Sequence, residues 1–98
     1  MDAVKVVWLA TAAVSLDREY DYLSSINPHA ARSVFTRIVA VVSHLGEFPQ
    51  TGRRGQVAGT RELVVTGLPY MLVYRVTSEQ VEILRGIHTA TNLPESLQ

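Results

Sequence analysis

The stretch GTRELVVTGLPYMLVYRVTSEQVEILRGIH, residues 59–88, decides the fold. It holds three runs rich in Val, Ile, Leu and Tyr, at residues 62–66, 70–76 and 81–87. Gly67 and Pro69 interrupt the first connection and the polar residues 77–80 interrupt the second, as turns require. Such runs predict β-strands, and connections this short join antiparallel neighbours. Residues 59–88 therefore predict a three-stranded antiparallel meander.

Alternation along these strands divides the meander into two faces. One face is almost wholly apolar and is expected to be the core face: Leu63, Val65, Tyr70, Leu72, Tyr74, Val76, Val81, Ile83 and Ile87. The other face is mixed: Glu62, Val64, Thr66, Met71, Val73, Arg75, Glu82, Leu84 and His88. Parity puts Arg61 and Arg85 on the core side, where we expect them to reach solvent from strand ends. A mixed face of this kind is typical of a surface that a partner covers.

Two helices are predicted before the meander. Residues 10–25 carry an apolar stripe at helical spacing, with no strong cap at their start: Ala12, Leu16, Tyr20 and Leu23. Asn27 and Pro28 are favoured at a helix start, so a second helix is expected from there to about His44. Its buried stripe would be Ala31, Val34, Phe35, Ile38, Val41, Val42 and Leu45. The short link between the two helices predicts an antiparallel αα-hairpin.

The remaining segments complete the predicted architecture. Residues 4–8 form a β-branched run and are expected to be a fourth strand, at a sheet edge or paired with one of the later three. Residues 46–59 contain four glycines and a proline and are expected to be a loop. The chain is thus predicted to be one α+β domain over residues 1–98. Its order is β-α-α-β-β-β, with a helical hairpin packed on one face of a small antiparallel sheet.

Composition excludes several kinds of site. Nine basic and nine acidic residues give a formal net charge of zero, so no overall field attracts nucleic acid. Absence of cysteine and three dispersed histidines make a metal site improbable, and no cofactor is indicated. No apolar segment approaches the length of a membrane span, and no signal peptide is recognised. A cytoplasmic protein is expected.

Two polar groupings point to chemistry without deciding it. His88 could lie beside Glu62 or Glu82, a pairing suited to general acid–base catalysis, although a surface histidine near an incidental carboxylate is the commoner case. Five arginines could gather and hold phosphates, or could be ordinary solvated side chains: Arg53, Arg54, Arg61, Arg75 and Arg85. For each grouping, the residues alone leave both interpretations open.

A family resemblance adds to this pattern. The segments GTREL (59–63), LPY-x-x-VYRV (68–76) and ILR-x-x-H (83–88), in that order, resemble the RelE/ParE superfamily of bacterial type II toxins, in its ParE-like branch. The resemblance spans nearly the whole chain and implies the same β-α-α-β-β-β fold. It also implies a toxin that a cognate antitoxin neutralises. ParE-like members inhibit DNA gyrase, whereas RelE-like members are ribosome-dependent mRNA endonucleases.

One comparison separates the two branches. RelE-like nucleases carry basic residues on the open sheet face, where they stabilise charge on the scissile phosphate. At the corresponding positions, aligned on Tyr70, this chain has Glu62, Val64 and Met71. A gyrase inhibitor that hydrolyses nothing is therefore the expected function. The alternative nuclease would use Glu62 and His88 as base and acid with Arg75 on the phosphate, and a third possibility is an inactive member that only binds antitoxin.

The resemblance also implies partners and their sites. An antitoxin is expected to bury the apolar residues of the mixed face: Val64, Met71, Val73 and Leu84. Candidates for contact with the target are Arg61, Arg75, Arg85 and His88. Contact with DNA is expected only through the antitoxin, within a toxin–antitoxin hetero-oligomer. The tail at residues 89–94 departs from the ParE-like pattern, because Leu93 stands where an aromatic residue is usual and the basic residue is missing.

Overall fold

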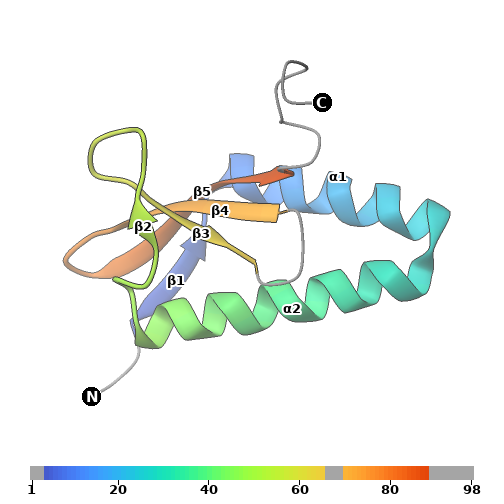
Figure 1. The fold of residues 1–98 in the computed structure, drawn as a ribbon, viewed down its shortest axis with the longest axis horizontal. Coiled ribbons are helices and arrows are strands. Elements are labelled where there is room, and N and C mark those ends of the chain that lie inside the picture. The colour runs from blue at the N-terminus through green and yellow to red at the C-terminus, as the bar shows by residue number, and fades with distance from the viewer. Residues whose placement is uncertain (1–3, 66–69, 89–98) are drawn as a thin grey trace.

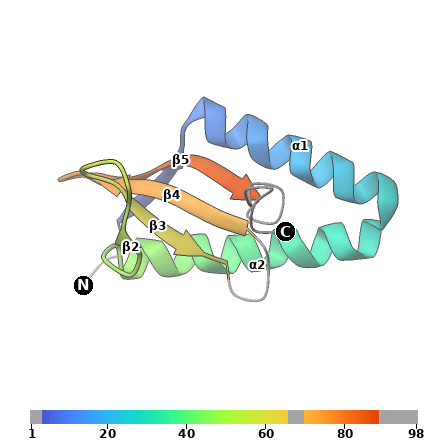
Figure 2. The same ribbon diagram turned by 45° about the horizontal axis from the view of Figure 1, so that its top comes forward.

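The computed structural model describes residues 4–65 and 70–88. The predictions for Thr66, for the turn at 67–69 and for the tail at 89–94 lie outside these residues. The elements in chain order are β1 (Lys5–Trp8), α1 (Ala10–Ile26), α2 (Pro28–Glu47), β2 (Arg53–Arg54), β3 (Arg61–Val64), β4 (Tyr70–Val76) and β5 (Gln80–His88). Both helices lie on one side of a five-stranded sheet of order β1-β5-β4-β3-β2 (Figures 1 and 2). The predicted α+β class and helical hairpin are confirmed.

The helix starts follow from local chemistry. At the start of α2 the Asn27 Oδ1 accepts a hydrogen bond from the Ala30 N–H at 3.1 Å, and Pro28 occupies the first turn. This satisfies one of the N–H groups that a helix start leaves unpaired. Helix α1 has no side-chain cap. Both starts match the prediction, while α2 runs past His44 to Glu47.

The sheet is mixed rather than wholly antiparallel. Strands β3, β4 and β5 form the predicted meander, but β1 pairs with β5 in parallel, with Trp8 opposite Ile83. The chain between β1 and β5, which includes the hairpin of α1 and α2, provides the long connection that a parallel pairing needs. Strand β2 lies inside the segment predicted as a loop, and it pairs with β3. Two residues are too few to show a strand period in the sequence.

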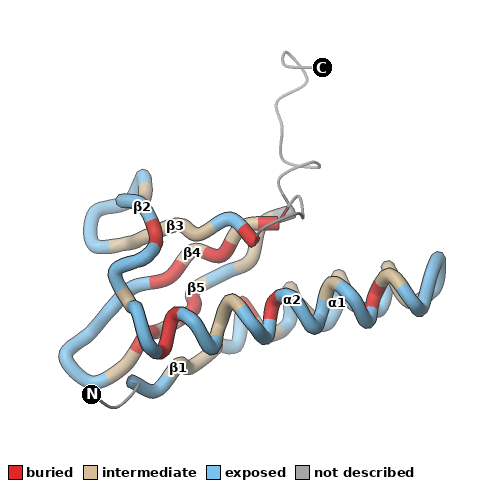
Figure 3. Tube along the Cα trace, turned by 60° about the horizontal axis from the view of Figure 1, so that its bottom comes forward, coloured by how far each residue is buried: buried red, intermediate tan, exposed pale blue. Residues whose placement is uncertain are grey.

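The core lies between the helices and the near face of the sheet. Ala12 from α1 and Ile38 and Leu45 from α2 form one buried cluster with six residues of the meander, which are Val65, Tyr70, Leu72, Tyr74, Val81 and Ile83. Figure 3 marks the buried stretches of the chain in red. This confirms the predicted core face for these six positions. The helices extend beyond the sheet (Figure 1). For that reason Tyr20 and Phe35, predicted to be buried, stay partly exposed and pack edge to face at 5.8 Å between centroids.

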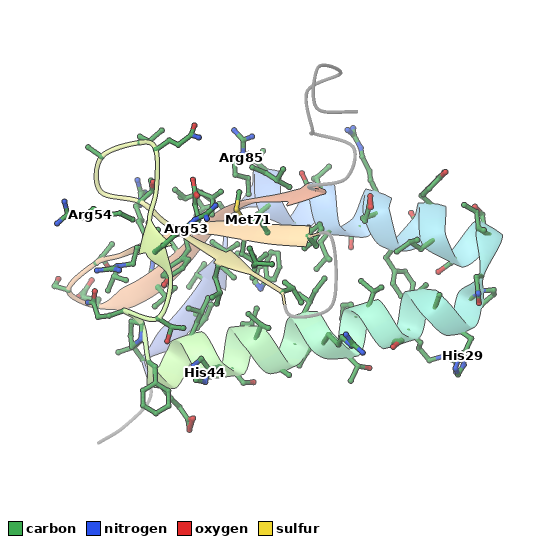
Figure 4. All side chains as sticks on the ribbon, viewed as in Figure 1. His29, His44, Arg53, Arg54, Met71 and Arg85 are labelled. Atoms are coloured by element: carbon green, nitrogen blue, oxygen red, sulfur yellow. The ribbon has the colours of Figure 1, made fainter. Side chains whose placement is uncertain are left out.

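A β-bulge in β5 overturns part of the face assignment. Tyr74 pairs with Ile83 but Val73 pairs with Arg85, so Leu84 is an extra residue in β5. One extra residue inverts the alternation beyond it. The predictions that put Arg85 and Ile87 on the core side are therefore wrong. Figure 4 shows Arg85 on the same side of the sheet as Met71, and Val76, also predicted as core, is 37% exposed at the end of β4.

Two buried tyrosines of β4 differ in how their hydroxyls are satisfied. The Tyr74 hydroxyl donates to the Pro49 carbonyl and accepts from the Gly52 N–H, each at 2.8 Å. It thereby ties the segment before β2 to the centre of the sheet. The Tyr70 hydroxyl is buried and has no hydrogen-bond partner among the described residues. The two positions form a matched pair for testing what a buried hydroxyl contributes.

Tyr74→Phe is expected to lower the free energy of unfolding by about 2 kcal/mol, because it leaves a buried N–H without an acceptor. Tyr70→Phe is expected to change it by less than about 0.5 kcal/mol, because no hydrogen bond is lost. Urea denaturation followed by circular dichroism measures both values. Equal losses at the two positions would contradict the assignment.

The burial of Tyr70 and Tyr74 also predicts how the stability of the protein changes at alkaline pH. Burial raises the pKa of Tyr70 and of Tyr74 above 10.0, the value for an exposed tyrosine. Both hydroxyls therefore stay neutral in the folded protein after those of the unfolded chain begin to ionise. The contribution of these two hydroxyls to the free energy of unfolding is fully present below pH 10 and is lost as the pH rises above it. Tyr70→Phe should make this fall less steep.

Candidate functional site

The sheet face turned away from the helices is the candidate site, and we call it the open face. Cross-strand pairing arranges its side chains in three rows. The first is Arg53, Glu62, Val73 and Arg85, from β2 to β5. The second is apolar: Val64, Met71 and Ile87. The third is Arg75 opposite Glu82. The open face thus combines an apolar row with two rows that carry charged residues, both on the same side of it.

Most charges of the open face are paired within it. Arg53 Nε lies 3.1 Å from Glu62 Oε1, and the other carboxylate oxygen accepts from the Gln56 N–H at 3.3 Å. Arg75 Nε lies 2.6 Å from Glu82 Oε1. The hydrogen bonds from Gln80 and then from Arg75 lower the pKa of Glu82. These two hydrogen bonds therefore favour the charged form of the Glu82 carboxylate.

Arg85 differs from Arg53 and Arg75. Its side chain is exposed, and its cross-strand neighbour is Val73. Among the described residues no carboxylate forms a salt bridge with it. Arg53 also reaches the apolar row, since its Nη2 lies 3.8 Å from the Met71 sulfur. A ligand of this surface would therefore bring apolar side chains for the second row and one carboxylate for Arg85.

A free strand edge borders the open face. Strand β2 pairs only with Arg61 and Glu62, so the outer edge of β3 beyond Glu62 has no pairing partner within the described part of the chain. A hollow of about 290 Å³ separates this edge from α2, with a mostly apolar lining: Ala40, Val41, His44, Thr51, Leu63 and Val64. Val64, at its rim, is 50% exposed. An unpaired edge beside an apolar hollow suits the addition of a strand from another chain.

The register does not bring the three residues of the nuclease alternative into one row. Glu62 lies opposite Val73, two positions from Arg75 on β4. The backbone of His88 pairs with Tyr70, three positions from Val73 in the other direction. At about 3.4 Å per residue this is about 10 Å along the strand. His88 is described by its backbone alone.

The four target candidates likewise do not share a surface. Arg75 and Arg85 lie on the open face. Arg61 lies opposite Tyr74, on the other side of the sheet, and its Nη1 donates to the carbonyl of Gly52 at 2.7 Å.

The bulge also changes the surface predicted for the antitoxin. It makes Leu84 the extra residue of β5, while Ile87 joins Met71 in the apolar row. Only the bulge places Ile87 there, and no sequence signal indicated it.

The described residues contain no group of three His, Asp or Glu side chains close enough to hold a metal ion. None of the helices within residues 4–65 and 70–88 combines the length and apolar character that a membrane span needs.

Comparison with known proteins gives consistent results. The family model for the ParE toxin of the type II toxin–antitoxin system parDE matches residues 6–93. A protein of Sinorhizobium fredii (strain NBRC 101917 / NGR234) named "Putative toxin Y4kP" is 37% identical over 97 residues, which cover 99% of this chain and all of the relative. A solved structure described as a chromosomal ParDE TA system from P. aeruginosa superposes with a TM-score of 0.75 at 30% identity. That match covers 85% of this chain and 92% of the solved one.

Proposed function

The chain belongs to the ParE toxin family of type II toxin–antitoxin systems, and from this premise we propose that it inhibits DNA gyrase and is neutralised by a cognate antitoxin. The inhibitor acts by binding and hydrolyses nothing. It acts in the cytoplasm, where its target lies, and it reaches operator DNA only as part of a complex with its antitoxin.

The observation that carries the proposal is the composition of the open face. Cleavage of RNA needs cations aimed at the charge that develops on the phosphate. On this face Met71 lies between Val64 and Ile87. Arg53 and Arg75 are each paired with a carboxylate. A surface that carries an apolar row, and on which these two arginines are neutralised by carboxylates, favours binding of protein over phosphate chemistry.

Expression of the chain without antitoxin is expected to arrest growth. The purified protein is expected to block supercoiling by DNA gyrase when present in excess over the enzyme. Full supercoiling activity under that condition would refute gyrase as the target. Restoration of activity by the cognate antitoxin tests neutralisation in the same assay.

One observation favours the nuclease alternative, namely Arg85, which the bulge turns toward the open face without a described carboxylate partner. If the chain cut mRNA, primer extension on translated messages would show codon-biased ends that vanish in Arg85→Ala and His88→Ala. We expect no such ends. Cuts in the unmodified protein would replace the gyrase proposal with a ribonuclease.

The antitoxin is proposed to dock on the open face and the free edge of β3. A strand of the antitoxin would pair with the outer edge of β3 beyond Glu62, beside the hollow that α2 borders. Its apolar residues would cover Val64, Met71 and Ile87, and a carboxylate would pair with Arg85. Val73 lies in the adjacent row and would be covered with them.

A further inference from the structure

The five arginines of residues 53–85 separate onto the two faces of the sheet. Arg53, Arg75 and Arg85 lie on the open face. Arg54 and Arg61 pair directly with each other across β2 and β3 and lie on the other side. Figure 4 shows Arg54 projecting from β2 away from Arg53 and Met71. Like charges placed directly opposite in a sheet destabilise it, so this pair calls for an explanation that the open face does not provide.

These two arginines line a hollow that contains no acid. The hollow has a volume of about 460 Å³ and is formed by Gln50, Arg54, Gly55, Val57, Ala58, Gly59, Thr60, Arg61 and Val76. None of these residues carries a negative charge, whereas Arg53 and Arg75 on the open face have Glu62 and Glu82 beside them. The hollow therefore concentrates two positive charges with no carboxylate in its lining.

The walls of the hollow are held in place. The Arg61 Nη1 donates to the carbonyls of Gly52 at 2.7 Å and Gln50 at 3.4 Å, which fixes the guanidinium. The loop between β2 and β3 is closed by the Gly55 N–H to the Thr60 carbonyl at 2.8 Å. The Thr60 hydroxyl donates to the Val57 carbonyl at 2.6 Å. Arg61 and the loop backbone are therefore ordered before a ligand binds, which reduces the entropy lost on binding.

The geometry points to a binding site for a phosphate monoester in this hollow, and we propose that Arg54 and Arg61 hold its phosphate. A phosphate monoester carries close to two negative charges at neutral pH, which match two guanidiniums, and arginine recognises it with paired hydrogen bonds. The exposed apolar side chains of Val57 and Val76 at the rim provide contact for the organic part of the ligand. The site is independent of the gyrase and antitoxin proposals, since it lies on the other side of the sheet.

The test is a titration of the purified, ¹⁵N-labelled protein with three probes: inorganic phosphate, adenosine monophosphate and adenosine. The expected result is saturable shifts of the amides of Gly55, Gly59 and Thr60 with both phosphate-bearing probes and none with adenosine. Binding should weaken as salt is raised. The proposal would be overturned if neither inorganic phosphate nor adenosine monophosphate produced saturable shifts. It would also be overturned if adenosine bound as tightly as adenosine monophosphate.

A matched pair of variants separates this site from general attraction of anions. Arg54→Gln is expected to weaken binding of phosphate about ten-fold or more, the usual loss for one charged hydrogen-bonding group. Arg53→Gln removes the same charge from the adjacent residue on the open face and is expected to leave the affinity within about two-fold. Equal losses in the two variants would show a diffuse electrostatic effect and refute the site. Arg61 is left unchanged because it also anchors the loop carbonyls.

Discussion

Toxin carrying Val64→Asp is expected to bind its antitoxin about 100-fold more weakly than the unmodified toxin. Val64 lies in the apolar row of the open face and at the rim of the hollow beside β3. In the proposed complex the antitoxin covers this position, so an aspartate there would be buried without a partner. Losses of this size are typical of central interface positions, and a change of about 100-fold corresponds to about 2.7 kcal/mol. Isothermal titration calorimetry with the cognate antitoxin measures it.

Val39→Asp is the matched control for this prediction. Val39 lies on α2 and is 48% exposed, against 50% for Val64, so both variants place a carboxylate on an already accessible site. We expect Val39→Asp to leave the affinity for antitoxin unchanged. The opposite result, loss at Val39 and none at Val64, would move the antitoxin from the open face to the helical hairpin.

The cellular readout follows from the same change. Co-expressed antitoxin is expected to restore growth in cells that carry the unmodified toxin or Val39→Asp, and to fail with Val64→Asp. Toxicity of Val64→Asp in the absence of antitoxin shows that the variant still folds. A Val64→Asp protein that is not toxic would need its stability measured before the binding result is interpreted.

Gly86→Ala is expected to lower the free energy of unfolding by about 3 kcal/mol, near the upper end of the usual cost of overpacking. Gly86 pairs with Leu72, and the ring of Tyr70 lies across it. An added Cβ would lie 2.6 Å from Cζ of that ring and still closer to its hydroxyl oxygen. Tyr70 is buried, so the ring has little room to move away.

Two further variants check the cause of this effect. In Gly86→Ala/Tyr70→Leu the smaller side chain leaves space for the methyl group, so the combined loss should be smaller than the sum of the single losses. At Gly59 an added Cβ meets nothing within 4 Å, but φ is 82°. Gly59→Ala should therefore cost about 1 kcal/mol through backbone strain alone. Additive losses at Gly86 and Tyr70 would show that contact with the ring is not the cause.

The sequence determined those parts of the fold that depend on neighbours along the chain. Asn27 and Pro28 set the start of α2 through the hydrogen bond to Ala30 and the fixed proline backbone. The alternating apolar residues of β3 and β4, such as Leu72 and Tyr74, identified the face that packs on the helices. The motifs GTREL, LPY-x-x-VYRV and ILR-x-x-H indicated the family that the comparisons then showed.

Tertiary structure alone decided the composition of the two sheet faces. Alternation holds only while a strand pairs residue for residue, and the extra residue Leu84 moves Arg85 and Ile87 to the open face. The short strand β2 turns Arg53 and Arg54 to opposite sides, so one is paired with Glu62 and the other meets Arg61. Both effects arise from pairing between distant segments, which local sequence patterns do not encode. For this reason the sequence was sufficient to identify the toxin fold, while the surfaces proposed for antitoxin and for phosphate required the assembled sheet.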